Sequence, residues 1–273
     1  MREQSTQAVF ITGASSGLGE ALAREYAAQG ALLGLVGRRA DALKSLRASL
    51  PNAGLHHIYV LDVNDHAALQ QAAQHFIDAV GIVDTVIASA GISVGTLTEL
   101  SEDLAVFRRV MDTNVLATVA SFAPFIEHMK AHAQQRPCRL VGIASVAGIR
   151  GLPGASAYSA SKAAVISYCE SLRVELRATG IKVVTIAPGY IDTPMTQINT
   201  YAMPFLLPAQ EFARRAIRSI QAGVSYRVIP WQMGIVAKVL RALPNFLYDL
   251  AFANAPRKSR LSNQLTNVDE GKS

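Results

Sequence analysis

Ala8-Val-Phe-Ile-Thr-Gly-Ala-Ser-Ser-Gly-Leu-Gly-Glu-Ala-Leu-Ala-Arg-Glu-Tyr-Ala-Ala-Gln29 is the stretch that decides the fold. Its first five residues have the apolar, β-branched character of a buried strand, and residues 20–29 are good helix formers. Between them lies Gly-x-x-x-Gly-x-Gly, which differs from the Gly-x-Gly-x-x-Gly dinucleotide fingerprint. Glycines allow a tight turn and close backbone approach, and a helix N-terminus offers free N–H groups to phosphates. The order therefore predicts a phosphate-binding turn, with an ordinary glycine turn as the alternative.

The same alternation of strand and helix continues along the chain. Further apolar strands are predicted at 32–37, 58–61, 85–89, 139–144, 182–187 and 226–229, with helices around 41–46, 69–80, 104–129, 158–176 and 209–222. Strands that alternate with helices indicate an α/β fold, a doubly wound parallel sheet with helices on both faces. In such folds ligands bind at the carboxyl ends of the strands, where most of the motifs described below lie.

Composition excludes several classes of function. The 273 residues are half apolar and carry a net charge of +6, but Lys and Arg are scattered, so we expect no nucleic-acid partner. Cys138 and Cys169 lack metal-ligand spacing, so neither a disulfide framework nor a metal site is predicted. His56 and His57 are interpreted as strand-edge residues. The polar start of the chain shows no signal peptide, and we expect a cytoplasmic protein.

A second motif carries the chemistry. Tyr158 and Lys162 lie four residues apart on a predicted helix, so they share one face. A phenol has an ordinary pKa of ~10, and a fixed cation nearby favours the phenolate and lowers that pKa toward the working range. Tyr158 is therefore a candidate general acid or base, and Ser145, at a strand end, is a candidate hydrogen-bond donor to the reacting oxygen. The alternative is a half-buried ring beside a solvated amine.

Two arginines follow the second predicted strand. In a dinucleotide fold this strand end meets the adenosine ribose, where an acidic residue selects the free 2′-hydroxyl and a basic one the 2′-phosphate. Arg38 and Arg39 stand there, and a guanidinium suits phosphate oxygens. We therefore expect NADP(H) to be preferred over NAD(H). The alternative is a solvated pair that opens the next helix.

Taken together, these motifs resemble the short-chain dehydrogenase/reductase family over about residues 9–193, and the resemblance is expected to extend through the later strand 226–229. The resemblance rests on Thr12-Gly-Ala-Ser-Ser-Gly-Leu-Gly19, Asp62-Val63, Ala90-Gly91, Asn114, Ser145, Tyr158-x-x-x-Lys162 and Pro188-Gly189 with Thr193, all in family order. It implies a single Rossmann-type domain with a seven-stranded parallel sheet. Together with Arg38 and Arg39, it implies an NADP-dependent oxidoreductase acting on a carbonyl or secondary alcohol.

The resemblance further implies a role for individual residues. Asn114, Ser145, Tyr158 and Lys162 match the catalytic tetrad, in which Tyr158 exchanges the proton, Lys162 lowers its pKa and holds the nicotinamide ribose, Ser145 polarises the carbonyl and Asn114 supports a water relay. Read from its apolar neighbours alone, Asn114 is a satisfied structural polar group. The implied cofactor contacts are Gly13, Ser15, Ser16, Gly17, Leu18, Gly19, Arg38, Arg39, Asp62, Val63, Ser89, Ala90, Gly91, Tyr158, Lys162, Pro188, Gly189, Ile191 and Thr193.

One position departs from the family pattern. Many members carry Asn-Asn-Ala-Gly after the fourth strand, whereas this chain has Ala88-Ser89-Ala90-Gly91. Ser89 reaches less far than an asparagine amide, which affects the adenine side rather than the chemistry. Relatives often form dimers or tetramers through the helices that carry Asn114 and Tyr158, so a homo-oligomer is expected.

The remaining sequence bears on the substrate. We expect residues 1–230 to form the catalytic domain, with a substrate lid at about 194–222, and 231–273 to form a C-terminal extension. Residues 231–252 are apolar but interrupted by charge and proline, too broken for a span of about 20 apolar residues. Packing on the core or a neighbouring subunit is favoured, before a wall of an apolar substrate pocket or an interfacial membrane anchor aided by the basic end 257–260. Two alternatives to the NADP enzyme stay open, a dinucleotide-binding sensor and an NAD-dependent alcohol dehydrogenase.

Overall fold

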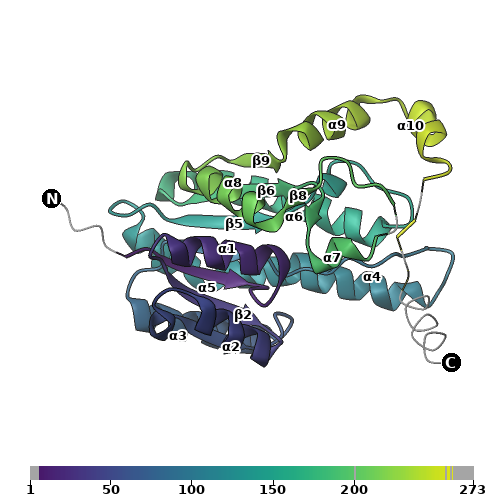
Figure 1. Cartoon of the computed structure of the whole chain (residues 1–273). Helices are drawn as coiled ribbons and strands as arrows, with labels where there is room; N and C mark the ends of the chain where they lie inside the picture. Colours follow the sequence, from purple (N-terminus) through teal and green to yellow (C-terminus); the bar gives the residue numbers. More distant parts are fainter. Residues whose placement is uncertain (1–5, 200, 256, 259, 261–273) are drawn as a thin grey trace, which may run out of the picture.

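A parallel sheet forms the centre of the computed structural model, which describes residues 6–199, 201–255, 257, 258 and 260. Within that part of the chain its seven strands run in the order β3-β2-β1-β4-β5-β6-β9 (Figure 1). They are β1 (Ala8–Thr12), β2 (Leu32–Gly37), β3 (His57–Val60), β4 (Thr85–Ala88), β5 (Arg139–Ile143), β6 (Lys182–Pro188) and β9 (Tyr226–Ile229). The predicted fold class is confirmed, with strand ends shifted by at most one residue.

The strand order reverses between β1 and β4. The chain moves outward from β1 to β2 and β3, then returns to pair β4 with the other side of β1. At such a switch point the two loops that leave the neighbouring strands run in opposite directions and open a crevice. The glycine-rich turn follows β1 and Ala90-Gly91 follows β4, so both border this crevice.

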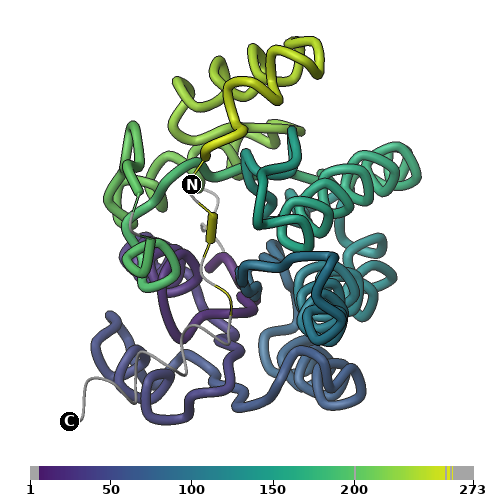
Figure 2. Tube along the Cα trace, turned by 90° about the vertical axis from the view of Figure 1, so that its right-hand side faces the viewer, coloured from purple at the N-terminus to yellow at the C-terminus, as the bar shows by residue number. Residues whose placement is uncertain are grey.

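Helices cover both faces of the sheet, as Figure 2 shows nearly end-on. On one face Phe10 of β1 contacts the rings of Phe76 and Phe125 at centroid distances of 5.5 and 4.9 Å. On the other face Tyr26 and Phe212 are fully buried. The first face is covered by α3 (His66–Val80), α5 (Ala117–His132) and α6 (Ser156–Glu175), and the second by α1 (Gly17–Ala28), α2 (Ala40–Ser49) and α8 (Ala209–Gln221).

A π-helical turn interrupts the predicted long helix over 104–129. The structure divides it into α4 (Asp103–Met111), the π turn η2 (Asp112–Leu116) and α5, which follow one another without a break. The sequence pattern indicated the helix but not the turn. Asn114 lies at its centre, and π turns inside α-helices are frequent at functional sites.

The segment predicted as a lid contains ordered elements. The short helix α7 (Pro194–Gln197) is followed by β8 (Leu207–Pro208), which pairs in parallel with β7 (Ile191–Asp192), a contact that the sequence did not predict. Helix α8 packs its buried side against the sheet and α1. Only the part before α8 therefore remains a candidate for the lid. The three-residue 3-10 turns are η1 (Ala53–Leu55), η3 (Val146–Gly148) and η4 (Arg177–Thr179).

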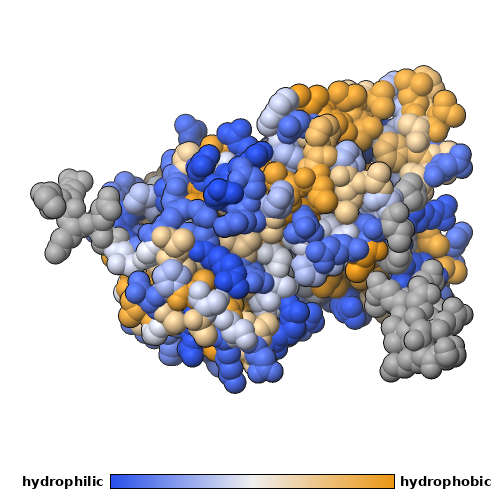
Figure 3. Space-filling view, viewed as in Figure 1, coloured by the Kyte–Doolittle hydropathy of each residue, from blue (hydrophilic) through white to orange (hydrophobic). Residues whose placement is uncertain are grey.

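The C-terminal extension forms two helices, α9 (Trp231–Ala242) and α10 (Asn245–Phe252), and only one side of them packs on the domain. The Arg150 guanidinium holds them in place, since it donates to Leu243 O at 2.7 Å and lies 3.9 Å from the ring centroid of Tyr248. The outer side is an apolar surface visible over α9 and α10 in Figure 3. Its exposed members are Trp231, Ile235, Val236, Val239, Phe246, Leu247 and Leu250. The prediction that residues 231–252 pack on the core therefore holds for the inner side of the two helices, whereas their outer side is exposed within this chain.

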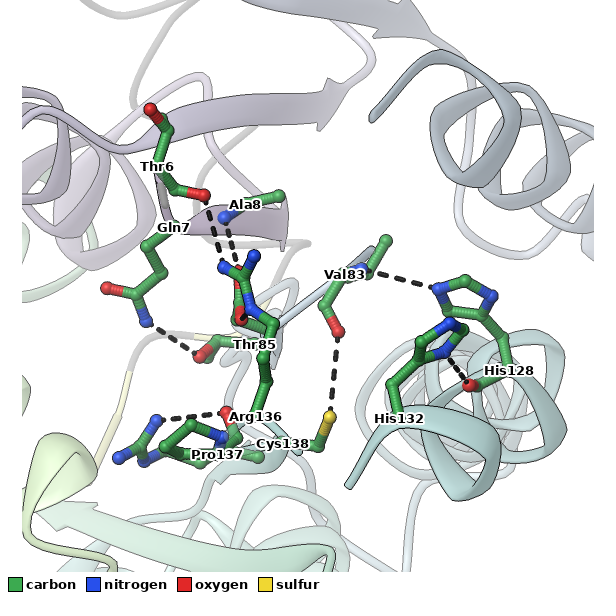
Figure 4. A network of polar contacts seen from close by, with 12 residues as sticks. Thr6, Gln7, Ala8, Val83, Thr85, His128, His132, Arg136, Pro137 and Cys138 are labelled. Carbon is green, nitrogen blue, oxygen red and sulfur yellow. Dashed lines mark hydrogen bonds and ion pairs between the residues drawn. The ribbon is translucent and has the colours of Figure 1, made fainter. Parts of the chain in front are cut away.

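A buried ion pair ties together the strand ends opposite the motifs. The Asp84 carboxylate accepts hydrogen bonds from Arg136 Nε and Nη2, both at 2.8 Å, and from Ala8 N at 2.7 Å. Arg136 also donates to Thr6 O at 3.2 Å (Figure 4). This network joins the start of β1, the residue before β4 and the segment before β5. It therefore holds these three strands together at their amino-terminal ends, opposite the motifs.

Candidate active site

The glycine-rich turn has the geometry of a phosphate cradle. Helix α1 begins at Gly17, and its N-cap Ser16 makes no side-chain capping bond, which leaves first-turn N–H groups free of a side-chain cap. Gly13 has φ +71°, and a Cβ there would lie 2.7 Å from Ala90 Cα. A side chain at this position is therefore excluded both by backbone strain and by contact. The residues present fit a dinucleotide pyrophosphate.

One cleft gathers nearly all of the predicted site residues. It lies at the carboxyl ends of the strands, and Asn114 is the one member of the predicted set that does not line it. The predicted residues in its wall are Gly13, Ser15, Ser16, Gly17, Leu18, Gly19, Arg38, Arg39, Asp62, Val63, Ser89, Ala90, Gly91, Ser145, Tyr158, Lys162, Pro188, Gly189, Ile191 and Thr193. Residues at the ends of six strands and on helix α6 thus meet in one volume.

Three polar side chains meet at one end of this cleft. Ser145 follows β5 and caps η3, where its Oγ accepts from Ala147 N at 3.1 Å. Tyr158 lies in the first turn of α6, and Lys162 Nζ is 5.8 Å from the centroid of its ring. Lys162 is buried and donates from Nζ to Ile143 O at 2.8 Å. The serine, the phenol and the ammonium are therefore held by a strand end and one helix face.

The electrostatics of the pair differ from the sequence-based expectation. Burial raises the pKa of Tyr158 above its ordinary value, and the Ser145 hydroxyl opposes that rise. Burial also lowers the pKa of Lys162 to about 8. Desolvation thus dominates the pKa of Tyr158, which is raised rather than lowered as the sequence predicted.

Asn114 lies behind the cleft, in the π turn, and is completely buried. Its Nδ2 donates to Ile92 O at 3.0 Å and to Ser161 Oγ at 2.9 Å, while Oδ1 accepts from Ile92 N at 2.8 Å. Both amide hydrogens and one acceptor site of the oxygen are used in these bonds. It joins the loop after β4 to α6, the helix that carries Tyr158 and Lys162.

The two arginines lie at the other end of the cleft. Arg39 Nη2 donates to Ser15 O at 3.0 Å, which links it to the glycine-rich turn. Arg38 Nη1 lies 3.6 Å from Asp62 Oδ2, and both side chains are exposed. An exposed pair of this kind is weak and leaves the guanidinium free to take another anion.

The loop after β6 borders the cleft beside α7. Thr193 caps α7, where its hydroxyl lies 3.2 Å from that of Thr196 and the two residues form a capping box. Gly17 faces this residue, because a Cβ on the glycine would lie 3.5 Å from Thr193 Cβ. The cleft therefore narrows between the glycine-rich turn and the start of α7.

The sequence analysis missed a contribution from the C-terminal tail. The basic end 257–260 was considered only in the alternative of a membrane anchor, whereas Lys258 Nζ donates to Ser93 Oγ at 2.7 Å and lies 5.8 Å from the Tyr158 ring centroid. Arg260 forms ion pairs with Asp103 and Glu102 at 2.8 and 3.0 Å. No local pattern in the sequence signals these contacts, which span more than 150 residues.

Other interpretations concern residues outside the cleft. His56 is buried, accepts from Leu33 N at 3.3 Å and lies 2.9 Å from Pro51 O, while His57 opens β3, as expected of strand-edge residues. Cys138 and Cys169 are buried free thiols. Across the described ranges, no cluster of His, Cys, Asp and Glu is suited to a metal ion, and no helix has the length and apolarity needed to cross a bilayer.

The fold and this cleft define a nucleotide-binding oxidoreductase, and comparison with known proteins gives the family. Residues 7–202 match the family model described as short chain dehydrogenase. An uncharacterized oxidoreductase of Myxococcus xanthus (strain DK1622) is 36% identical over 252 residues, 92% of this chain and 98% of that protein. The chain belongs to the short-chain dehydrogenase/reductase family, and the predicted membership is confirmed.

Two further similarities concern activity and structure. The 2-dehydro-3-deoxy-L-rhamnonate dehydrogenase (NAD(+)) of Sphingomonas sp. (strain SKA58) is 36% identical over 186 residues, 68% of this chain and 72% of that protein. The crystal structure of 3-ketoacyl-(acyl-carrier-protein) reductase from Brucella melitensis complexed with NADH superposes with a TM-score of 0.75 at 26% identity, covering 82% of this chain and 96% of that one. The protein is thus a dehydrogenase/reductase of carbonyl or alcohol substrates that uses a nicotinamide dinucleotide.

Proposed function

We propose that the protein is an NADP-dependent oxidoreductase that interconverts a carbonyl and a secondary alcohol, with Tyr158 as general acid and base. The observation that carries this proposal is the position of two sets of residues in one cleft. Ser145, Tyr158 and Lys162 lie at one end, and the glycine-rich turn with Arg38 and Arg39 lies at the other. A dinucleotide laid between them brings its reactive ring to the phenol.

Each side chain has a distinct task in this reaction. When bound, the nicotinamide ring supplies or accepts the hydride. Tyr158 donates its proton to the carbonyl oxygen during reduction and takes it back during oxidation. The Ser145 hydroxyl donates a hydrogen bond to the same oxygen, where charge develops. Lys162 supplies a positive charge beside the phenol and holds the ribose hydroxyls, and Asn114 positions α6 through Ser161.

The residues that the sequence predicts as cofactor contacts are proposed to bind the dinucleotide. Arg38 and Arg39 favour NADP because two guanidiniums flank the strand end where the adenosine ribose binds, and no carboxylate follows Gly37 directly. NAD is the second candidate. Asp62 already pairs with Arg38 at 3.6 Å, and the names of the two relatives reported above carry NAD(+) and NADH.

The region around Tyr158 is partly apolar, which supports a substrate with an apolar body. Ile92 and Met195 line the cleft, and the rings of Tyr190 and Tyr201 lie beside one another at 6.4 Å. Burial raises the pKa of Tyr201, and the neighbouring phenols Tyr190 and Tyr158 add to that rise. An aromatic wall near the catalytic phenol would exclude water from the reacting carbon.

Binding and turnover together test the proposal. NADPH and NADH are titrated against the protein by fluorescence, and a panel of ketones and aldehydes is then reduced with the tighter cofactor. Preference for NADPH and turnover of an apolar ketone support the proposal. Tight binding with no turnover across the panel favours the alternative of a dinucleotide-binding sensor, and tighter binding of NADH assigns the enzyme to NAD.

A further inference from the structure

A second lysine stands beside the catalytic phenol. Lys258 comes from the C-terminal tail, and its Nζ lies 5.8 Å from the centroid of the Tyr158 ring, the same distance as Lys162 Nζ. Within the described residues, Lys258 Nζ donates a hydrogen bond to Ser93 Oγ at 2.7 Å, in the loop after β4. Figure 2 shows the described tail residues crossing the middle of the face where the strands end.

The tail is held at this place by contacts on both sides of the lysine. Arg260 binds Asp103 in a bidentate pair, with Nε and Nη2 at 2.8 and 2.9 Å from the two carboxylate oxygens. Asp103 is buried and also accepts from Leu97 N at 2.7 Å. On the other side Arg257 packs on Gly154, where an added Cβ would lie 2.8 Å from Arg257 Cβ. Such a geometry fixes Lys258 rather than leaving it to solvent.

The charge of Lys258 has no counter-ion in the described part of the chain. No carboxylate there lies within ion-pair distance of its Nζ, whereas Arg260 has two such partners. Burial lowers the pKa of Lys258 to about 8, so the amine is still mainly charged at pH 7. A partly buried, unpaired cation is unfavourable, and an incoming anion would relieve that cost.

We propose that Lys258 and Ser93 form the binding site for an anionic group of the substrate, located close to its reactive carbonyl. The class of substrate is then a carbonyl compound that bears a carboxylate or a similar oxyanion a few bonds from the carbonyl carbon. The inference rests on the proposed function, since it gives the substrate of the same site.

The hydrogen-bonding capacity of the two residues fits an oxyanion. Ser93 Oγ accepts a hydrogen bond from Lys258 Nζ, so its own hydrogen is free to be donated to a ligand oxygen. The ammonium retains two further donors. Charge-assisted bonds to a carboxylate are the strong class of hydrogen bond, and together they would fix the carbonyl toward Tyr158.

Binding of simple carboxylates tests this site without requiring turnover. Butyrate, hexanoate and octanoate are titrated by calorimetry into the NADP-loaded protein, each beside its neutral carboxamide. We expect each carboxylate to bind about tenfold or more tightly than its amide, and Lys258→Met to remove that ratio. Lys238→Met, an exposed lysine of α9, is the matched control and should keep it.

The outcomes separate this inference from the proposed function. Equal binding of carboxylate and amide by the wild type, or an unchanged ratio in Lys258→Met, overturns the anion site even if neutral ketones are reduced. Tighter carboxylate binding in Lys258→Met would show that the tail occupies the site as a plug, which also overturns it. Loss of cofactor binding in the wild type instead contradicts the proposed function.

Discussion

Lys162 Nζ bonds the carbonyl oxygen of Ile143 at 2.8 Å and lies 5.8 Å from the Tyr158 ring centroid. Both residues lie on α6, and the lysine side chain is fixed by the end of β5 rather than by a bond to the phenol. Replacement of the phenol should therefore change the chemistry without disturbing the fold.

Tyr158→Phe should reduce turnover by about 10²- to 10⁴-fold, because the variant lacks the proton donor while the ring still fills its place. Cofactor affinity and melting temperature should stay close to wild type. Steady-state reduction of an apolar ketone measures the effect. Tyr226→Phe on the edge strand β9 is the control and should be fully active, and near-normal turnover by Tyr158→Phe would remove the proposed acid.

In the cofactor-free protein, Tyr158 should stay protonated to a higher pH than a free tyrosine does, because burial raises the pKa of its phenol. A raised pKa keeps the neutral form up to higher pH, so the ultraviolet difference between wild type and Tyr158→Phe should correspond to less than half of one tyrosinate at about pH 10, the ordinary pKa of a phenol. The other tyrosines shift in the same direction and add no early signal. A one-residue tyrosinate signal below pH 9 would mean that Lys162 outweighs burial.

The parts of the site that the sequence predicts are those with local patterns. The strand, glycine turn and helix of residues 8–29 are contiguous, and Tyr158 and Lys162 are four residues apart on one helix. Parallel strands place their carboxyl ends at one edge, so residues after different strands meet there without any further information. This is why almost the whole predicted set lines one cleft.

The features of the site that were not predicted from the sequence depend on long-range contacts and on burial. Lys258 reaches Ser93 across 165 residues, and nothing in the pattern near either residue specifies the contact. The π turn at Asn114 depends on its carboxamide bonding Ile92 and Ser161 rather than on helix propensity. The direction of the Tyr158 pKa depends on burial, which spacing alone does not reveal.

Replacement of both Arg38 and Arg39 by Ala should weaken the binding of NADPH by about tenfold or more per guanidinium. The affinity for NADH should change little, because NADH lacks the 2′-phosphate that the two guanidiniums are proposed to bind. Fluorescence titration of both cofactors measures the two affinities. Lys44→Ala on the exposed side of α2 removes a nearby charge and should leave both affinities unchanged. Equal losses for NADPH and NADH would refute the 2′-phosphate assignment.

Arg136→Met should destabilise the fold by about 3 kcal/mol, because it leaves the buried Asp84 carboxylate without its cation. Asp84 would keep only the Ala8 N–H among its three donors, and the starts of β1, β4 and β5 would lose their common link. Urea unfolding of the wild type and variant measures the difference. The matched control is Lys130→Met, whose partner Glu127 is highly exposed, and it should change stability by less than about 1 kcal/mol. Equal effects of the two variants would show that the buried network contributes no more than a surface pair.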